Sequence, residues 1–296
     1  MKRRAFVSLI PLLLAPAWAR AASRDRYSRG VLWQIRYRGK PASHVFGTIH
    51  VPDRRLAALP APVARAFESA RSLTLEFVAE GAARERFLEA AMFLDAQTLE
   101  DKIGPRDFER VVELMAPIGL SRDFILKLKP WGVLINLRAP RGPAPAARPT
   151  LDEQLVARAR ARRLALHAME SVEEQIFTFD EFPMDSQVAL LHHALENRTE
   201  LIEMSERTLQ AYLARDLDGI WRVQENFVRR HPEIAAHNAV FVKRVLYDRS
   251  VVMAFRMQRQ LRYGNAFVAI GALHLHGARG VLALLESDGY RARRIY

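Results

Sequence analysis

The chain carries the stretch Ser43-His-Val-Phe-Gly-Thr-Ile-His50, and near its other end it carries Ala266-Phe-Val-Ala-Ile-Gly-Ala-Leu-His274. Each is a short apolar run that ends in Gly-x-x-His, with the glycines at Gly47 and Gly271. Short apolar runs of this kind are typical of buried strands. Ligands of open α/β sheets bind at the carboxyl ends of strands. Two histidines just past two strand ends therefore predict one site assembled from both ends of the sequence.

The segments that follow the two motifs are also alike. A helix-like segment at 61–70 and a strand-like run at 73–77 follow the first, and similar segments at 278–286 and 290–296 follow the second. Neither end holds enough strands for its own core, so the two halves are expected to share one sheet. The predicted fold is α/β, with a mixed central sheet built from two related halves at the chain ends and a long helical insertion at about 82–260.

Two further segments complete the predicted sheet. Residues 31–37 alternate loosely in polarity and end at a turn signal, which predicts a hairpin with residues 42–46. Residues 164–169 form a short apolar run inside the otherwise helical middle, and this run ends at Glu170. We expect it to be a strand.

The amino terminus has the pattern of a secretory signal peptide. Three basic residues at 2–4 precede an apolar stretch at 5–18, and Ala19-Arg-Ala21 provides a small-x-small cleavage site. Cleavage after Ala21 would leave residues 22–296 as a single domain in the periplasm or outside the cell. Retention of the segment as a membrane anchor is the alternative. No later stretch is long and apolar enough to cross a bilayer.

Composition narrows the chemistry. The 296 residues include no cysteine, which excludes disulfides, thiolate zinc sites, cysteine nucleophiles and a lipoprotein anchor. The formal net charge is +12, and it falls to about +8 without the basic residues of the signal peptide. This basic surface could face envelope polysaccharide or lipid headgroups, although a solvated basic face is the more usual interpretation. No nucleic-acid-binding motif is present.

Two of the nine histidines share the strand-exit position, namely His50 and His274. A glycine three residues earlier lets the backbone turn tightly, and a neutral imidazole is a common ligand of divalent transition metals. The two histidines could form one site or lie in unrelated loops. His192 could pair with Glu196 on a solvated helix face, and His167 is expected to be a core or edge histidine.

Glu76 is the main acidic candidate. It follows the apolar residues of the 73–77 run, where a carboxylate costs energy unless a metal ion or a cation faces it. The alternative is an exposed glutamate on an edge strand, and the same two interpretations apply to Glu170. The sequence has no Gly-x-Ser-x-Gly elbow, P-loop, His-Glu-x-x-His helix or EF-hand loop. Serine-triad, nucleotide-hydrolysis and helix-borne zinc-protease functions therefore lack their usual residues.

The order of several short motifs resembles the TraB/GumN family, which is related to the Tiki metalloproteases. The motifs are His44-Val-Phe-Gly-Thr-Ile-His50-Val-Pro-Asp53, Leu75-Glu76, Lys129-Pro-Trp131, Leu151-Asp152, Glu170 with Glu174-Gln175, and Gly271-Ala-Leu-His274-Leu-His-Gly277. The resemblance implies a divalent-metal site made by His50, His274 and Glu76. It suggests manganese or a cobalt-like ion, and zinc also suits these ligands.

The implied activity is metal-dependent hydrolysis, with a peptide or protein as the first-choice substrate. Glu76 would be a ligand or the general base, and Arg249 would stabilise developing charge or hold an acidic residue. Family members usually carry Glu-Arg-Asn ahead of the second motif, where this chain has Asp248-Arg-Ser250, and Leu273 replaces a usual glycine. Ser250 thus replaces an amide that could orient a ligand.

Two other functions agree with the same resemblance. The protein could be a non-enzymatic accessory or binding factor in envelope or exopolysaccharide assembly. It could also bind haem or iron, as relatives of this fold do, but the sequence offers no evident exposed haem ligand.

Overall fold

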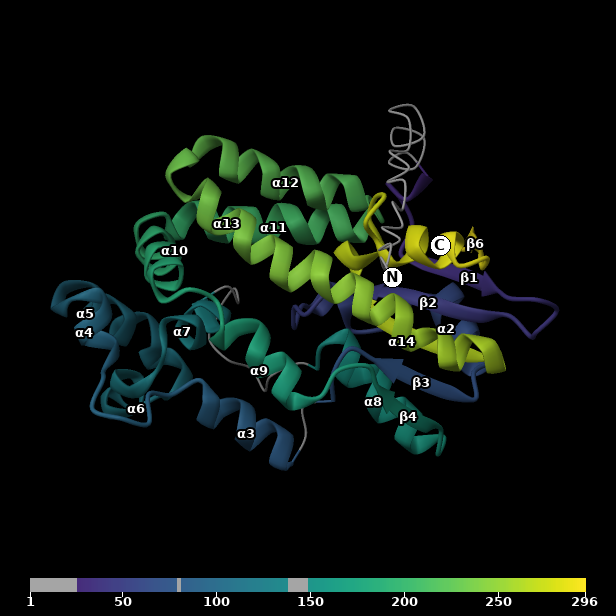
Figure 1. Cartoon of the computed structure of the whole chain (residues 1–296), viewed down its shortest axis with the longest axis horizontal. Coiled ribbons are helices and arrows are strands. Elements are labelled where there is room, and N and C mark those ends of the chain that lie inside the picture. Colours follow the sequence, from purple (N-terminus) through teal and green to yellow (C-terminus); the bar gives the residue numbers. More distant parts are fainter. Residues whose placement is uncertain (1–25, 79–80, 138–148) are drawn as a thin grey trace, which may run out of the picture.

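A computed structural model describes residues 26–78, 81–137 and 149–296 (Figure 1). The predicted signal peptide lies outside the described residues. Within them, no helix combines the length and apolar character needed to cross a membrane.

In the described part of the chain, six strands form one sheet in the order β4-β3-β5-β2-β1-β6. The neighbours β4, β3, β5 and β2 are parallel, whereas β1 is antiparallel to both β2 and β6. The strands are β1 (Leu32–Arg36), β2 (Ser43–Thr48), β3 (Ser72–Leu75), β4 (Ala165–Ala168), β5 (Ala266–Gly271) and β6 (Arg291–Arg294).

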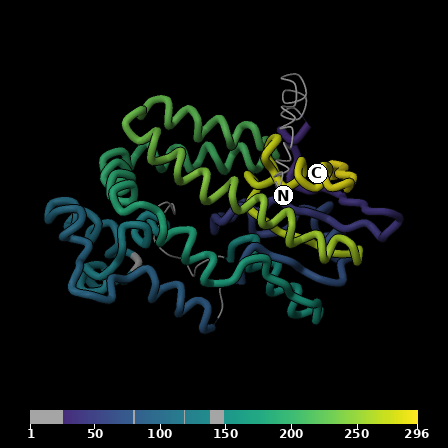
Figure 2. The backbone as a smooth tube through the Cα atoms, in the orientation of Figure 1, coloured from purple at the N-terminus to yellow at the C-terminus, as the bar shows by residue number. Residues whose placement is uncertain are grey.

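The two ends of the chain interleave within this sheet. Strand β5, from the carboxyl-terminal half, pairs with β2 on one side and with β3 on the other. Figure 2 shows the result, since the purple and yellow ends of the tube lie together in the sheet region. The predicted α/β fold, with one mixed sheet shared by both ends, is confirmed.

The helices account for most of the middle of the chain, as predicted. Those near the sheet are α2 (Ala61–Glu68), α8 (Leu151–Ala161), α14 (Arg249–Tyr263) and α15 (Val281–Ser287). Those of the insertion are α3 (Ala82–Ala90), α4 (Leu99–Ile103), α5 (Pro105–Met115), α6 (Arg122–Lys127), α7 (Pro130–Leu137), α9 (Val172–Asp180), α10 (Met184–Glu196), α11 (Arg198–Leu213), α12 (Leu217–Arg230) and α13 (Ala235–Val242). Short turns are η1 (Arg54–Leu56), η2 (Ala116–Ile118), η3 (Pro232–Ile234), the π-helical η4 (Lys243–Asp248) and η5 (Ala272–Leu275).

Two large apolar clusters hold these layers together. One surrounds the sheet, where Phe67 of α2 packs edge-on against Phe267 of β5 at a centroid separation of 5.3 Å. The other lies within the insertion around Trp131 and Phe108, and it contains no strand residue. Burying one such aromatic or aliphatic side chain contributes about 1.5–3 kcal/mol. The insertion therefore has apolar packing of its own.

Helix α14 connects the insertion to the sheet. Its buried residues Met253, Met257 and Leu261 recur every four positions and form one apolar face. This face packs on α15 and β5. As a result the first turn of α14, with Arg249 and Ser250, reaches the side chains that follow β3 and β5.

Candidate functional site

The four parallel strands have their carboxyl ends on the same side of the sheet, and a polar side chain follows each of these ends. Across this edge the residues come in the order Glu170 after β4, Glu76 after β3, His274 within the turn that follows β5, and His50 after β2. The predicted strand at 73–77 ends at Leu75. The Glu76 carbonyl still accepts a hydrogen bond from the backbone N–H of Glu170 at 2.8 Å, and the Glu76 carboxylate turns toward Gly271.

The three residues expected to form one site converge beside Gly271. The position that a Cβ atom would take on this glycine lies 3.3 Å from Glu76 Oε1, 3.5 Å from His274 Cδ2 and 4.0 Å from His50 Nε2. His274 Nε2 and Glu76 Oε1 are 3.8 Å apart, a separation that two ligands of one ion can span with bonds of about 2 Å. The glycine leaves this space open, and any other residue would fill it.

Ser250 determines which nitrogen of His274 faces that space. The Ser250 hydroxyl donates a hydrogen bond to the carbonyl oxygen of Leu246 (2.7 Å) and lies 2.8 Å from His274 Nδ1. Because the hydroxyl has one proton, His274 Nδ1 must be the donor, and Nε2 keeps its lone pair. Burial lowers the pKa of His274 to about 4, so the ring is neutral at neutral pH.

His50 has an equivalent arrangement on the other side. Its Nδ1 lies 3.0 Å from Asp152 Oδ2, and the other oxygen of Asp152 accepts a hydrogen bond from the Thr48 hydroxyl at 3.0 Å. The His50 side chain is 62% exposed. Burial lowers its pKa, but the Asp152 and Glu76 carboxylates together outweigh this effect and raise the pKa to about 9. Without a metal, His50 is therefore protonated at neutral pH.

Arg249 holds two buried carboxylates together. Its Nη2 donates to Glu76 Oε2 at 2.6 Å and to Glu170 Oε2 at 2.7 Å, and its Nε donates to Glu170 Oε1 at 2.9 Å. Gln175 donates a further hydrogen bond to Glu170 at 2.6 Å. Glu170 is 5% exposed, so the interpretation as an exposed edge glutamate was wrong. The guanidinium of Arg249, on α14, compensates the energetic cost of burying the Glu170 carboxylate.

Glu76 is ionised in this environment. Burial raises the pKa of its carboxyl group, but the electrostatic effects of His274 and Arg249 are larger together, and the pKa falls to about 2. The backbone N–H of Gly271 also donates to Glu76 Oε1 at 2.5 Å. A carboxylate with so low a pKa is a weak proton acceptor near pH 7.

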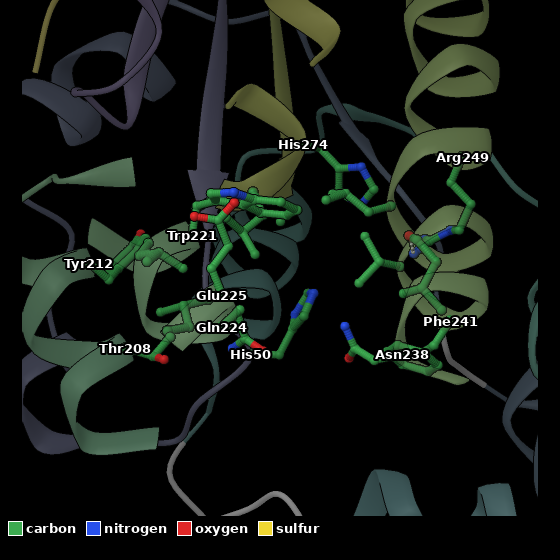
Figure 3. A pocket seen from close by; sticks show the side chains of 18 of the residues that line it. His50, Thr208, Tyr212, Trp221, Gln224, Glu225, Asn238, Phe241, Arg249 and His274 are labelled. Atoms are coloured by element: carbon green, nitrogen blue, oxygen red, sulfur yellow. Dashed lines mark hydrogen bonds between the residues drawn. The ribbon is translucent and has the colours of Figure 1, made fainter. Parts of the chain in front are cut away.

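A cavity of about 700 Å³ opens from these residues toward the helical insertion. Figure 3 shows the rings of His274, above, and His50, below, with Trp221, Gln224, Asn238 and Phe241 from the helices around the cavity. This volume is typical of a small-ligand pocket. These wall residues were not predicted from the sequence, because their spacing on α12 and α13 is that of any amphipathic helix.

Asp152 and Gln175 belong to the motifs that resemble the family, but the sequence assigned neither of them a role in positioning the site. Asp152 lies in a sequence that reads as the start of a helix, and its contact with His50 depends on how α8 packs. Gln175 is likewise a helix residue whose partner is distant in the sequence.

Other histidines behave differently from the two site histidines. His192 Nδ1 contacts Asp107 Oδ2 at 2.6 Å instead of pairing with Glu196. His167 lies on β4, an edge strand of the sheet, as expected. Among the described residues, the one trio of His, Cys, Asp or Glu side chains whose donor atoms all lie within 4.8 Å of one another is at His193, His231 and Glu233, so the donor atoms of His50, Glu76 and His274 are spread more widely.

Comparison with known proteins agrees with the motif pattern. The uncharacterized protein YbaP of Shigella flexneri is 23% identical over 273 residues, which cover 90% of this chain and 96% of YbaP. No solved structure matches the chain. The sequence model of the TraB/PrgY/gumN family matches residues 31–294, which include both Gly-x-x-His motifs. The chain therefore belongs to the TraB/PrgY/gumN family.

Proposed function

We propose that the protein is a metal-dependent hydrolase whose metal ion is held by His50, Glu76 and His274. The observation that carries this proposal is the matched setting of the two imidazoles. Each has its Nδ1 beside a partner, Asp152 for His50 and Ser250 for His274, while its Nε2 atom is left for the site. Metal-binding histidines are normally oriented in this way by a second group.

Within this site Glu76 acts as a ligand instead of the general base. Its low pKa makes it a poor base, and its two oxygens are already oriented by Arg249 and by the Gly271 N–H. Arg249 holds acidic residues in place, namely Glu76 and Glu170, instead of stabilising charge that develops on the substrate. A divalent ion bound here would lower the pKa of a bound water toward about 7 and polarise a carbonyl group.

The cavity favours a peptide as the substrate. The carboxamides of Gln224 and Asn238 line it, and a carboxamide can both donate to and accept from a peptide group. Trp221 and Phe241 offer apolar surface for side chains. With the predicted signal peptide, the substrate would be a peptide or an unfolded segment in the periplasm or outside the cell.

The test uses the purified mature chain after removal of metals with a chelator. Manganese, cobalt or zinc is added back, and cleavage of a library of quenched fluorescent peptides is followed. We expect cleavage that depends on added metal, and a loss of at least about a hundredfold in His274→Ala and Glu76→Gln. His167→Ala and Glu173→Gln are the matched controls, because neither residue lines the cavity.

Two outcomes would contradict the proposal. Equal cleavage by the site variants and the wild type would place the activity elsewhere. Metal binding at the site without cleavage of any peptide would reject the hydrolase and favour the accessory or binding function in envelope assembly.

A further inference from the structure

A second group of ligand-type side chains lies in the helical insertion, away from the sheet edge. His193 is on α10, His231 ends α12, and Glu233 is in the η3 turn that follows. His193 Nδ1 is 3.3 Å from Glu233 Oε1 and also 3.3 Å from Asn197 Nδ2, and His231 Nδ1 is 3.4 Å from the Glu233 oxygen. The donor atoms of all three residues lie within 4.8 Å of one another.

These separations match the geometry of a tetrahedral metal ion. With bonds of about 2.0–2.1 Å, the ligand atoms of a tetrahedral zinc ion are about 3.3–3.4 Å apart. The two Nδ1 atoms thus approach Glu233 Oε1 at a ligand-to-ligand distance instead of the usual length of about 2.8 Å for a charged hydrogen bond.

The other nitrogen of His231 is held as in known zinc sites. His231 Nε2 contacts Glu200 Oε2 at 2.7 Å, and Arg230 Nε donates to the other carboxylate oxygen at 2.8 Å. A carboxylate that accepts from Nε2–H leaves the lone pair on Nδ1, which is the nitrogen near Glu233. Phe227 packs against both imidazoles, with ring centroids 5.5 Å and 4.7 Å away, and shields one side of the group.

We propose that His193, His231 and Glu233 form a second, structural site for zinc or a similar divalent ion, with water as the fourth ligand. Glu233 is 59% exposed on its side chain, so a water and the entering ion can reach this side. The ion would connect α10 to the end of α12. Because α12 also provides Trp221 and Gln224 to the wall of the cavity, the ion would fix the wall in place. This site does not depend on the proposed activity.

The experiment measures zinc binding to the full mature chain by equilibrium dialysis and by the shift of the thermal unfolding midpoint. In a His50→Ala/His274→Ala background, which removes the first candidate site, we expect one zinc per chain. Adding Glu233→Gln should weaken this binding at least about tenfold, and Glu200→Gln should weaken it about 10–100-fold through the orientation of His231. Glu196→Gln is the matched control, since this glutamate is exposed on α10 one turn from His193.

The same comparison in the otherwise unchanged chain keeps the test valid if the double variant does not fold. Glu233→Gln should then lower the zinc content by one equivalent, whereas Glu196→Gln should not. Equal zinc content and equal affinity in these two variants would overturn the second site. Absence of any zinc-dependent stabilisation in the His50→Ala/His274→Ala chain would overturn it as well.

Discussion

Ser250 illustrates how one hydroxyl can set the chemistry of a neighbouring ring. It accepts from His274 Nδ1 while it donates to the Leu246 carbonyl, so that the unprotonated nitrogen faces Glu76. The family pattern usually has an asparagine at this position. The chain therefore keeps an orienting group there, with a hydroxyl in place of an amide.

This role predicts the effect of Ser250→Ala. Loss of the hydroxyl should reduce manganese or zinc affinity at the proposed site of His50, Glu76 and His274 about 10–100-fold, because an orienting partner of a metal ligand contributes that much. The free energy of unfolding should fall by only about 1 kcal/mol. Titration calorimetry and urea unfolding measure the two effects. Ser287→Ala is the control, and an unchanged affinity in Ser250→Ala would contradict the assignment.

Arg249 has a different importance, since it neutralises two buried carboxylates. Arg249→Met should lower the free energy of unfolding by about 3–5 kcal/mol, because Glu76 and Glu170 would then be buried without their cation. Urea unfolding monitored by tryptophan fluorescence measures the change. Arg259→Met, on the exposed face of the same helix, should stay within about 0.5 kcal/mol of wild type. Similar stabilities for the two variants would mean that the Arg249 ion pairs contribute little.

At the scale of elements, the strand exits were predictable and the surrounding helices were not. Short apolar runs that end in Gly-x-x-His identify β2 and β5 and the position of each histidine. The rule that parallel strands share one carboxyl edge then brings Glu76 to them. The partners Asp152 and Ser250 lie on helices, and helical periodicity reports which face is apolar without reporting what that face contacts. The motif comparison placed Ser250 at an orienting position, but its contact with His274, and the contact of Asp152 with His50, required the packing of α14 and α8.

The attachment of α9 to α14 gives a prediction about pH. Hydrogen bonds from Arg256 hold the pKa of Glu174 at about 2, below its ordinary value of 4.5. A group whose pKa is lower in the folded state stabilises the protein above its unfolded pKa. This stabilisation is lost as the pH falls from about 4.5 through about 2.

Glu174→Gln should therefore destabilise the chain by less than about 1 kcal/mol at neutral pH, because the side chain is 43% exposed. The difference from wild type should shrink as the pH is lowered toward about 3. Urea unfolding at a series of pH values measures it, with Glu173→Gln on the same helix as control. A difference that grows on acidification would contradict this reasoning.

At the scale of the whole molecule, the site exists because the two chain ends interleave. β5 lies between β2 and β3, so His274 comes between His50 and Glu76 at the sheet edge. The symmetry of the two motifs predicted a shared sheet but not this strand order, which depends on which apolar faces the helices cover. The sequence likewise contains the cavity residues without indicating that α12 and α13 fold over the sheet edge.

The most direct test of the metal site is the anomalous X-ray scattering of crystals of the mature chain soaked with manganese. We predict a manganese peak about 2 Å from both His274 Nε2 and an oxygen of Glu76, with His50 as a further ligand. Manganese found only at other positions, or no manganese near these side chains, would contradict the claim that both ends of the chain build one metal site.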